Sequence, residues 1–152
     1  MTRNVEAYEA YLAGRSLTSL FTRENVSQAI EQFERAVALD PDFAVAWNAL
    51  ASVCNLAAST YIPERGEEFT KKAEAAASRA IALAPESVAS TLAAQQQYLQ
   101  HREYVAAEQS NKKAQALAPR DYQTNFLYAL FLLQVGRPSK AVAYFQRAIR
   151  FS

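Results

Sequence analysis

Glycine, cysteine and histidine are scarce in this chain of 152 residues, and their scarcity excludes several kinds of site. The three glycines, Gly14, Gly66 and Gly136, lie far apart, so the sequence contains no glycine-rich phosphate-binding loop. A single cysteine cannot form an internal disulfide, and a single histidine cannot build a histidine-based metal cluster. We therefore expect neither a metal nor a cofactor.

The chain also lacks an excess of charge of either sign. Its 16 basic and 15 acidic residues leave a net charge of +1, whereas nucleic-acid and membrane-surface proteins usually show a strong basic excess. An uncharged run over residues 43–62 is long enough to cross a membrane, but its asparagines, serines and threonine make it too polar. The alternative is a helix covered on most sides by other helices. We expect no membrane partner and no directly bound nucleic acid.

Residues 1–20 contain no continuous apolar stretch of the kind found in secretory signals. This pattern favours a cytoplasmic location. A periplasmic location is the alternative, if the chain is cut from a membrane-anchored regulator.

Internal repetition is the strongest positive signal. Prolines follow a leucine by two residues at Pro41, Pro85 and Pro119, at spacings of 44 and 34. Alanines recur in the same register, and several columns in one register are not plausibly chance. Two of these columns are Ala36, Ala80, Ala114, Ala148 and Ala29, Ala73, Ala107, Ala141.

A 34-residue period closed by proline resembles the tetratricopeptide repeat. The segment Trp47-x-x-Leu50-Ala51-x-x-Cys54 is similar to the first-helix motif of that family, and Ala29, Phe33, Ala36 and Pro41 match its second-helix motif. The third unit matches the motif less well, because Thr91 and Asn111 stand where the family has aromatic residues. The resemblance covers about residues 7–152.

The resemblance implies an all-α fold, a right-handed α-solenoid of about four antiparallel helix pairs. We expect a single domain over residues 1–152. Its repeats span about 5–41, 42–85, 86–119 and 120–152. Within them we expect helices near 5–20, 26–39, 43–60, 67–83, 87–101, 104–117, 121–135 and 138–150.

Local signals refine these boundaries. Asn25 or Ser27 is a candidate N-cap of the second helix and Ser87 of the fifth, while Pro138 suits the start of the last helix. The second unit is ten residues longer than the 34-residue period, which predicts an extended first helix and a loop around residues 63–66. The first unit also looks longer, with an insertion predicted at Phe21–Glu24.

The segment Asn4–Arg15 resembles the entry to the repeat region of certain bacterial signalling proteins. In those proteins the repeats follow a winged-helix DNA-binding domain or a nucleotide-cyclase domain, and neither domain is present in this sequence. The resemblance implies a regulatory module cut from a longer protein, whose activity lies elsewhere.

Nothing in the sequence forms a catalytic constellation, so we expect no enzyme. The aspartates all lie in turns beside the closing prolines, which does not supply a carboxylate pair in one cleft. His101 is expected to be a solvated turn residue. Cys54 occupies a packing position of the repeat and is expected to be a buried structural thiol.

The charges avoid the first helices of the last three units, since residues 43–62, 87–101 and 122–136 contain no Asp, Glu, Lys or Arg. In the family, first helices line a concave groove, so the resemblance implies a neutral groove that binds a peptide or a helix. Some members of the family bind the C-terminal carboxylate of a partner with lysines and arginines on these helices, and the corresponding positions of this chain are uncharged. The alternative is that the groove residues only face water or pack on a terminal helix. The groove positions of the family correspond to Asn48, Ser52, Asn55, Leu92, Gln96, Gln100, Phe126, Leu130 and Gln134.

Self-association is a second functional hypothesis. Val142, Phe145 and Ile149 in the last helix correspond to residues that a following first helix covers in earlier units. With no such helix in the sequence, these residues predict an uncovered apolar face and a weak homodimer through a two-fold contact. The alternative is that the native protein continues past residue 152 with a helix that covers this face. Arg147 and Arg150 flank the face, so the dimer is expected to tighten with salt.

Overall fold

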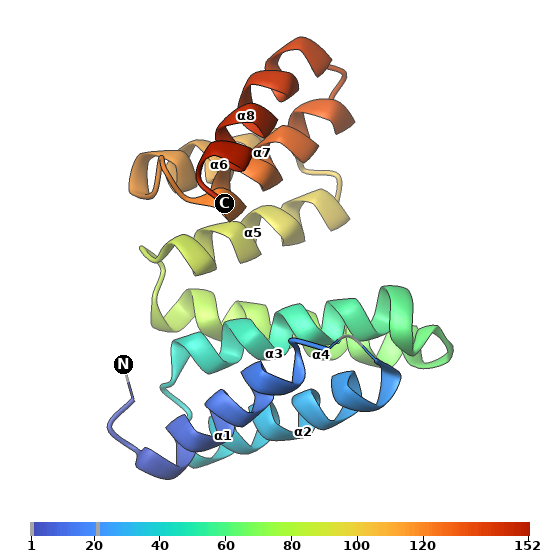
Figure 1. Ribbon diagram of the computed structural model, residues 1–152, viewed down its shortest axis with the longest axis vertical. Helices are drawn as coiled ribbons and strands as arrows, with labels where there is room; N and C mark the ends of the chain where they lie inside the picture. Colours follow the sequence, from blue (N-terminus) through green and yellow to red (C-terminus); the bar gives the residue numbers. More distant parts are fainter. Residues whose placement is uncertain (1, 21) are drawn as a thin grey trace. The chain divides into compact units, whose positions relative to one another are not determined.

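The computed structural model describes residues 2–20 and 22–152 and forms eight α-helices there, with no β-strand in the described ranges (Figure 1). This architecture confirms the predicted all-α class, and the helix boundaries agree with the predicted ranges within about three residues at most ends. The helices are α1 (Val5–Leu17), α2 (Arg23–Leu39), α3 (Ala44–Leu56), α4 (Gly66–Leu83), α5 (Val88–Gln100), α6 (Tyr104–Leu117), α7 (Tyr122–Gln134) and α8 (Pro138–Arg150).

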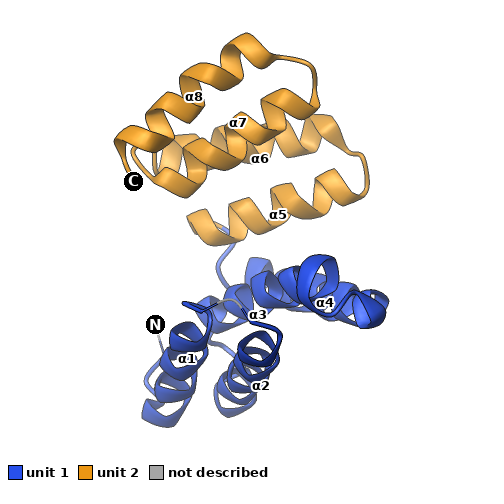
Figure 2. Ribbon diagram, turned by 45° about the vertical axis from the view of Figure 1, so that its right-hand side comes forward, with its two compact units in different colours: residues 1–85 blue, residues 86–152 orange. Residues whose placement is uncertain are grey.

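Consecutive helices pack as hairpins, α1 with α2, α3 with α4, α5 with α6 and α7 with α8 (Figure 1). The chain divides into two compact units, residues 1–85 and residues 86–152 (Figure 2). In unit 1, α2 also packs on α3, and in unit 2, α6 packs on α7. The division falls at the predicted boundary between the second and third repeats. A single domain over residues 1–152 stays a prediction.

Side-chain caps fix where several helices begin. The Ser87 hydroxyl accepts a hydrogen bond of 3.0 Å from a backbone N–H in the first turn of α5, as predicted. Pro138 is the first residue of α8, also as predicted. The predicted cap of the second helix is wrong. Thr22 caps α2 by accepting from the N–H of Asn25, and both Asn25 and Ser27 lie inside the helix.

The extra residues of unit 1 lengthen its second helices. Helices α2 and α4 contain 17 and 18 residues, against 14 and 13 in α6 and α8. All four helices end within one residue of the same register position, so the additional turns lie at their N-terminal ends. Of the insertion predicted at Phe21–Glu24, Phe21 lies outside the described residues. The other part of it belongs to helix: Arg23 and Glu24 form the first turn of α2.

The remaining excess extends α3, as predicted. A π-helical segment, Ala57–Tyr61, continues the helix, and the Ile62 N–H donates a 2.7 Å hydrogen bond to the Ala57 carbonyl five residues earlier. A short 3-10 turn, Pro63–Arg65, then leads directly into α4. The predicted loop around residues 63–66 is therefore a helical turn.

Phe33 anchors the interior of unit 1. Its side chain is 2% exposed, and its ring lies 6.0 Å from that of Tyr11. Gly14 faces the same ring so closely that a Cβ there would lie 2.6 Å from a Phe33 ring carbon. Trp47 is less buried than its place in the repeat motif suggests. It is half-buried, and its indole N–H donates to the Pro41 carbonyl at 2.8 Å.

Unit 2 combines an aromatic core with several buried polar side chains. Tyr128 lies 4.6 Å from the Tyr144 ring and packs with Phe131 in the core cluster. Asn111, at the register position of Phe33, is buried, and its Oδ1 has no hydrogen-bond partner among the described residues. Buried oxygens of Gln95 and Thr124 also lack a partner there. An unpaired buried oxygen costs about 1–3 kcal/mol, so each of these three positions lowers the stability of the unit.

The turns α5–α6 and α7–α8 have the same geometry. Each contains a residue with positive φ, Arg102 at 58° and Gly136 at 74°. In each turn the next N–H donates back across the turn, from Glu103 to Tyr98 at 2.8 Å and from Arg137 to Leu132 at 2.7 Å. These tight turns set the positions at which α6 and α8 begin.

Candidate functional site

The predicted binding residues of unit 1 lie along one face of α3. Asn48, Ser52 and Asn55 follow one another at helical spacings of four and three residues. Ser52 is exposed, whereas Asn48 and Asn55 are half-buried. The Asn48 Oδ1 is buried and has no hydrogen-bond partner in the described part of the chain. The face is thus polar and uncharged, with one side-chain oxygen left unpaired.

Helix α5 places its three predicted residues differently. Gln96 and Gln100 are exposed and available for hydrogen bonding. Leu92 is only 6% exposed, because it lies on the side of α5 that also carries the buried Thr91 and Gln95. Contrary to the expectation, Leu92 therefore contributes little to an apolar surface patch.

Helix α7 carries the apolar part of the predicted face. Phe126, Leu130 and Gln134 recur every four residues, and the last two are exposed. Phe126 is half-buried, since its ring lies 5.6 Å from that of Tyr122 and 5.8 Å from that of Phe145. The accessible portion of this face is the C-terminal half of α7.

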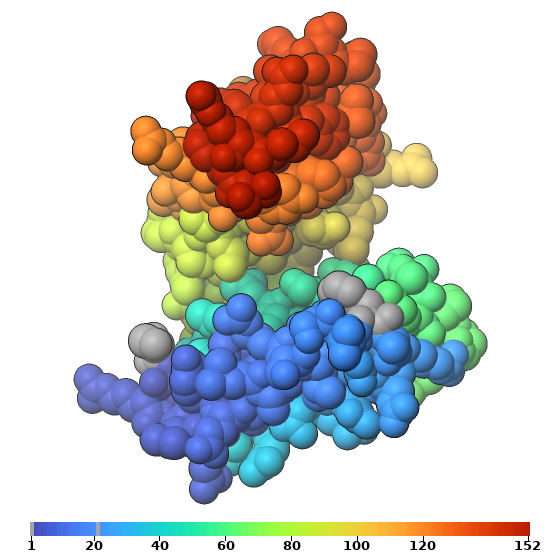
Figure 3. Space-filling view, in the orientation of Figure 1, coloured from blue at the N-terminus to red at the C-terminus, as the bar shows by residue number. Residues whose placement is uncertain are grey.

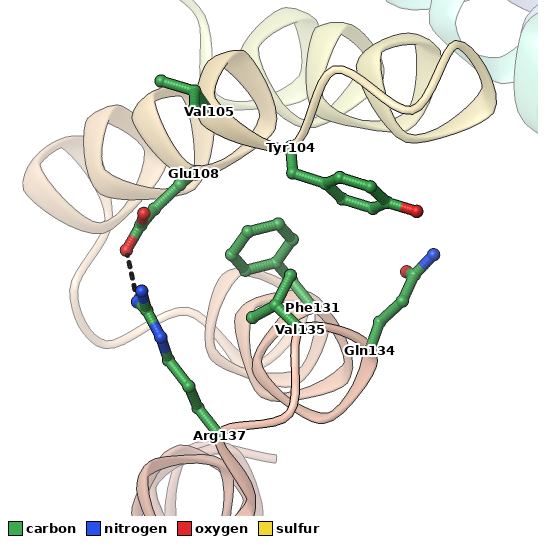
Figure 4. A pocket seen from close by; sticks show the side chains of 7 residues that line it. All are labelled: Tyr104, Val105, Glu108, Phe131, Gln134, Val135 and Arg137. Carbon is green, nitrogen blue, oxygen red and sulfur yellow. Dashed lines mark hydrogen bonds and ion pairs between the residues drawn. The ribbon is translucent and has the colours of Figure 1, made fainter.

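A pocket of about 480 Å³ opens at the C-terminal end of that face (Figure 4). Its walls come from the first turns of α6, the last turns of α7 and the turn before α8. Gln134 belongs both to the predicted face and to the pocket. The lining residues are Tyr104, Val105, Glu108, Phe131, Gln134, Val135 and Arg137.

The pocket has an apolar middle and polar ends. Figure 4 shows the Tyr104 hydroxyl and the Gln134 amide near one another, with the Glu108–Arg137 pair at the opposite end. Phe131 and Val135 lie between them. Phe131 is buried in the core of unit 2, so this part of the wall is rigid.

One carboxylate at the pocket serves two cations. Glu108 accepts a 3.0 Å hydrogen bond from Arg137 and lies 3.5 Å from the Lys112 ammonium. This end therefore carries one positive charge in excess. Burial raises the pKa of the Tyr128 phenol. Tyr144 and Glu108 raise this pKa further, and Arg137 lowers it by a smaller amount. Tyr128 therefore remains a neutral core residue at physiological pH.

The groups weighed as catalytic candidates occupy structural or solvated positions. His101 is exposed in the turn after α5. Cys54 is buried, and burial raises the pKa of its thiol to about 12, with a partly opposing effect of Lys72. Asp121 caps α7. None of these three residues lines the pocket.

Within residues 2–20 and 22–152, no three His, Cys, Asp or Glu side chains lie together in a position to hold a metal ion. No helix in these ranges has both the length and the apolarity needed to cross a membrane.

The predicted self-association face of α8 is partly covered. Val142 and Ile149 are 54% and 73% exposed. Phe145, expected to be uncovered, is half-buried because its ring packs against Phe126 and the core of unit 2. The exposed apolar surface of α8 therefore consists mainly of the two aliphatic side chains.

Sequence reasoning missed the pocket because one of its walls comes from a second helix, α6. Tyr104 and Val105 begin α6, and both are exposed. The sequence signal that could have revealed the pocket is the position of Tyr104 and Val105 on this helix. These two large apolar residues lie away from Ala107 and Ala114, the members of the two alanine columns that mark the buried side of α6.

Comparison with known proteins bears on the fold. No family model matches the chain, and no curated protein matches it. The crystal structure of TTC0263, a thermophilic TPR protein in Thermus thermophilus, superposes with a TM-score of 0.78 at 22% identity. That match covers 99% of this chain and 76% of TTC0263. The chain has the tetratricopeptide-repeat (TPR) fold.

Two further structures share this TPR fold with the chain. MamA matches with a TM-score of 0.62 at 22% identity, over 97% of this chain and 78% of MamA. A chain of the APC/C hetero-tetramer Cut9–Hcn1 matches with a TM-score of 0.66 at 18% identity, over 96% of this chain and 29% of that one.

Proposed function

We propose that the chain is a non-catalytic protein–protein interaction module that binds a peptide or a helix of a partner protein. The observation that carries the proposal is the absence of charged residues from the first helices α3, α5 and α7. Residues 43–62, 87–101 and 122–136 contain no Asp, Glu, Lys or Arg, and their exposed side chains include amides and leucines. Amides hydrogen-bond a peptide backbone as donors and as acceptors, which suits an extended or helical ligand.

Within unit 2, the pocket supplies the anchor for such a ligand. An apolar side chain of the partner packs on Phe131 and Val135, while Gln134 and the Tyr104 hydroxyl bond polar groups beside it. A volume of about 480 Å³ lies in the range of small-ligand pockets and accommodates a large side chain. Leu130, one turn earlier on α7, extends the apolar contact.

The wider setting we propose is a bacterial signalling or regulatory protein in the cytoplasm. The entry segment Asn4–Arg15 supports it, because this segment resembles the repeat regions of such proteins. The likeness to a chain of the Cut9–Hcn1 hetero-tetramer supports a scaffold role more generally. In this proposal, activity resides in the partner or in a linked domain.

Selection from a displayed library of random peptides tests the binding function. Enriched peptides are expected to bind the wild type and to bind Leu130→Glu and Gln134→Glu at least tenfold more weakly. Leu117→Glu is the matched control, because Leu117 and Leu130 are 45% and 42% exposed and only Leu130 lies on the proposed face. Absence of enrichment, or equal losses in Leu130→Glu and Leu117→Glu, would contradict the proposal.

Self-association through α8 is a second proposed function. It is supported by the exposed Val142 and Ile149, which lie two turns apart on one side of the helix. Sedimentation over a concentration series tests it, and a chain that stays monomeric at high micromolar concentration would contradict it.

A further inference from the structure

Helix α8 repeats an apolar pattern that is covered elsewhere in the molecule. In unit 1, the corresponding residues of α2 are buried, and α3 packs against that helix. The face of α8 thus has the composition of a docking site for a first helix. The corresponding pairs, in repeat register, are Ile30 with Val142, Phe33 with Phe145 and Val37 with Ile149.

The charges on α8 restrict what can cover this face. Lys140, Arg147 and Arg150 are exposed, and Pro138–Arg150 contains no acidic residue. Pairing of α8 with α8 of a second copy would bring these cations together, which opposes close contact. The covering helix is therefore expected to carry acidic residues beside its apolar stripe.

Helix α1 has this composition. Val5, Tyr8 and Leu12 are exposed at spacings of three and four residues, so they form one stripe along the helix. Glu6 and Glu9 are also exposed in the same turns. Both α1, in blue, and α8, in red, lie at the molecular surface in Figure 3.

The net charges of the two units have the same signs as those of the two helices: unit 1 is acidic and unit 2 is basic. Residues 1–85 contain eight basic and eleven acidic residues, whereas residues 86–152 contain eight basic and four acidic residues. Unit 1 of one copy and unit 2 of another therefore attract each other over distances of about 10 Å at moderate salt.

From these observations we infer that the chain assembles head to tail, with α1 of one copy docked on the exposed face of α8 of the next. The inference rests on the proposed self-association and specifies its second surface. Such a contact joins two different surfaces, so every open assembly keeps one free α1 and one free α8. The assembly therefore grows with concentration beyond a dimer, unlike the two-fold dimer expected from the sequence.

Two blocking variants test this geometry by sedimentation velocity. Leu12→Glu blocks the α1 stripe, and Ile149→Glu blocks the α8 face. Because both residues are exposed, both variants are expected to keep the wild-type circular dichroism spectrum. Each variant alone is expected to be monomeric, while their mixture forms a 1:1 dimer through the intact α1 of one and the intact α8 of the other. Leu117→Glu, exposed elsewhere on unit 2, is expected to assemble like the wild type.

Salt dependence gives a second readout. Raising ionic strength from about 0.05 M to about 0.5 M shortens the screening length several-fold, so the assembly is expected to dissociate at higher salt. Dimers of Leu12→Glu alone would overturn the head-to-tail contact while preserving self-association. A wild type that remains monomeric at high micromolar concentration in low salt would overturn both.

Discussion

Replacing Gly14 by alanine sets a local gain in helix stability against a clash inside unit 1. Gly14 is buried in α1, and a Cβ there would lie 2.6, 2.8 and 2.9 Å from three carbons of the Phe33 ring. That ring is buried and lies 6.0 Å from the Tyr11 ring, so it has little room to withdraw. The substitution therefore forces a shift of either the ring or the helix backbone.

The two effects differ in size. Alanine favours a helix interior over glycine by about 1 kcal/mol. Overpacking of a well-filled core costs about 1–3 kcal/mol. We expect the clash to prevail, with a net loss of about 1 kcal/mol in the free energy of unfolding. Phe33→Leu removes the clashing ring atoms, so Gly14→Ala is expected to cost less in that background.

Urea unfolding followed by the fluorescence of Trp47 measures this effect, because the chain has one tryptophan and it lies in unit 1. Ala13→Gly is the control. Ala13 is exposed on the same helix, so this change is expected to lose only the helix propensity of about 1 kcal/mol. A Gly14→Ala protein as stable as the wild type, or more stable, would refute the packing argument.

Three further predictions concern the turns, the buried Gln95 and the Cys54 thiol. Because Arg102 and Gly136 both have positive φ, Arg102→Gly is expected to raise the free energy of unfolding by about 0.5–1 kcal/mol and Gly136→Ala to lower it by about 1 kcal/mol. Urea titrations measure both changes, and effects of the same sign would contradict the prediction. Gln95→Met is expected to raise the free energy of unfolding by about 1 kcal/mol, because it removes an unpaired buried oxygen. The control Gln96→Met, at an exposed site, is expected to change the free energy of unfolding by less than about 0.5 kcal/mol. A destabilised Gln95→Met protein would show that this oxygen has a hydrogen-bond partner. The Cys54 thiol, with its pKa raised by burial to about 12 from 9.0, is expected to react with iodoacetamide at pH 9 at least tenfold more slowly in the folded chain than in urea. Equal alkylation rates in the folded chain and in urea would contradict the burial of the thiol. The same raised pKa makes the free energy of unfolding depend on pH: the contribution of the neutral thiol is complete below about pH 9 and is lost as the pH rises toward 12.

The fold could be predicted because the repeat register carries packing information. Alanines recur where helices of a pair approach closely, and all eight of the alanines in the two predicted columns are buried. Ser87 and Pro138 act locally, so their positions predicted helix starts correctly. The cap of α2 was assigned to the wrong residues because Thr22, Asn25 and Ser27 are all good caps, and the extra N-terminal turns of α2 shift the choice.

The site was harder to predict because exposure depends on how helices rotate against their neighbours. Leu92 occupies a family groove position yet is buried, and Phe145 is partly covered by Phe126 from its own hairpin. The pocket depends on α6 starting at Tyr104, after a turn in which Arg102 adopts a conformation that favours glycine. An arginine gives no sequence signal for that turn.

Backbone amide chemical-shift mapping by NMR, with a peptide enriched from the library, tests the proposed binding face most directly. We expect the largest shifts at Leu130, Phe131, Gln134 and Val135 on α7 and at Tyr104 on α6, the residues of the exposed face and its pocket. Shifts concentrated instead on the second helices α2, α4 or α8 would contradict the account.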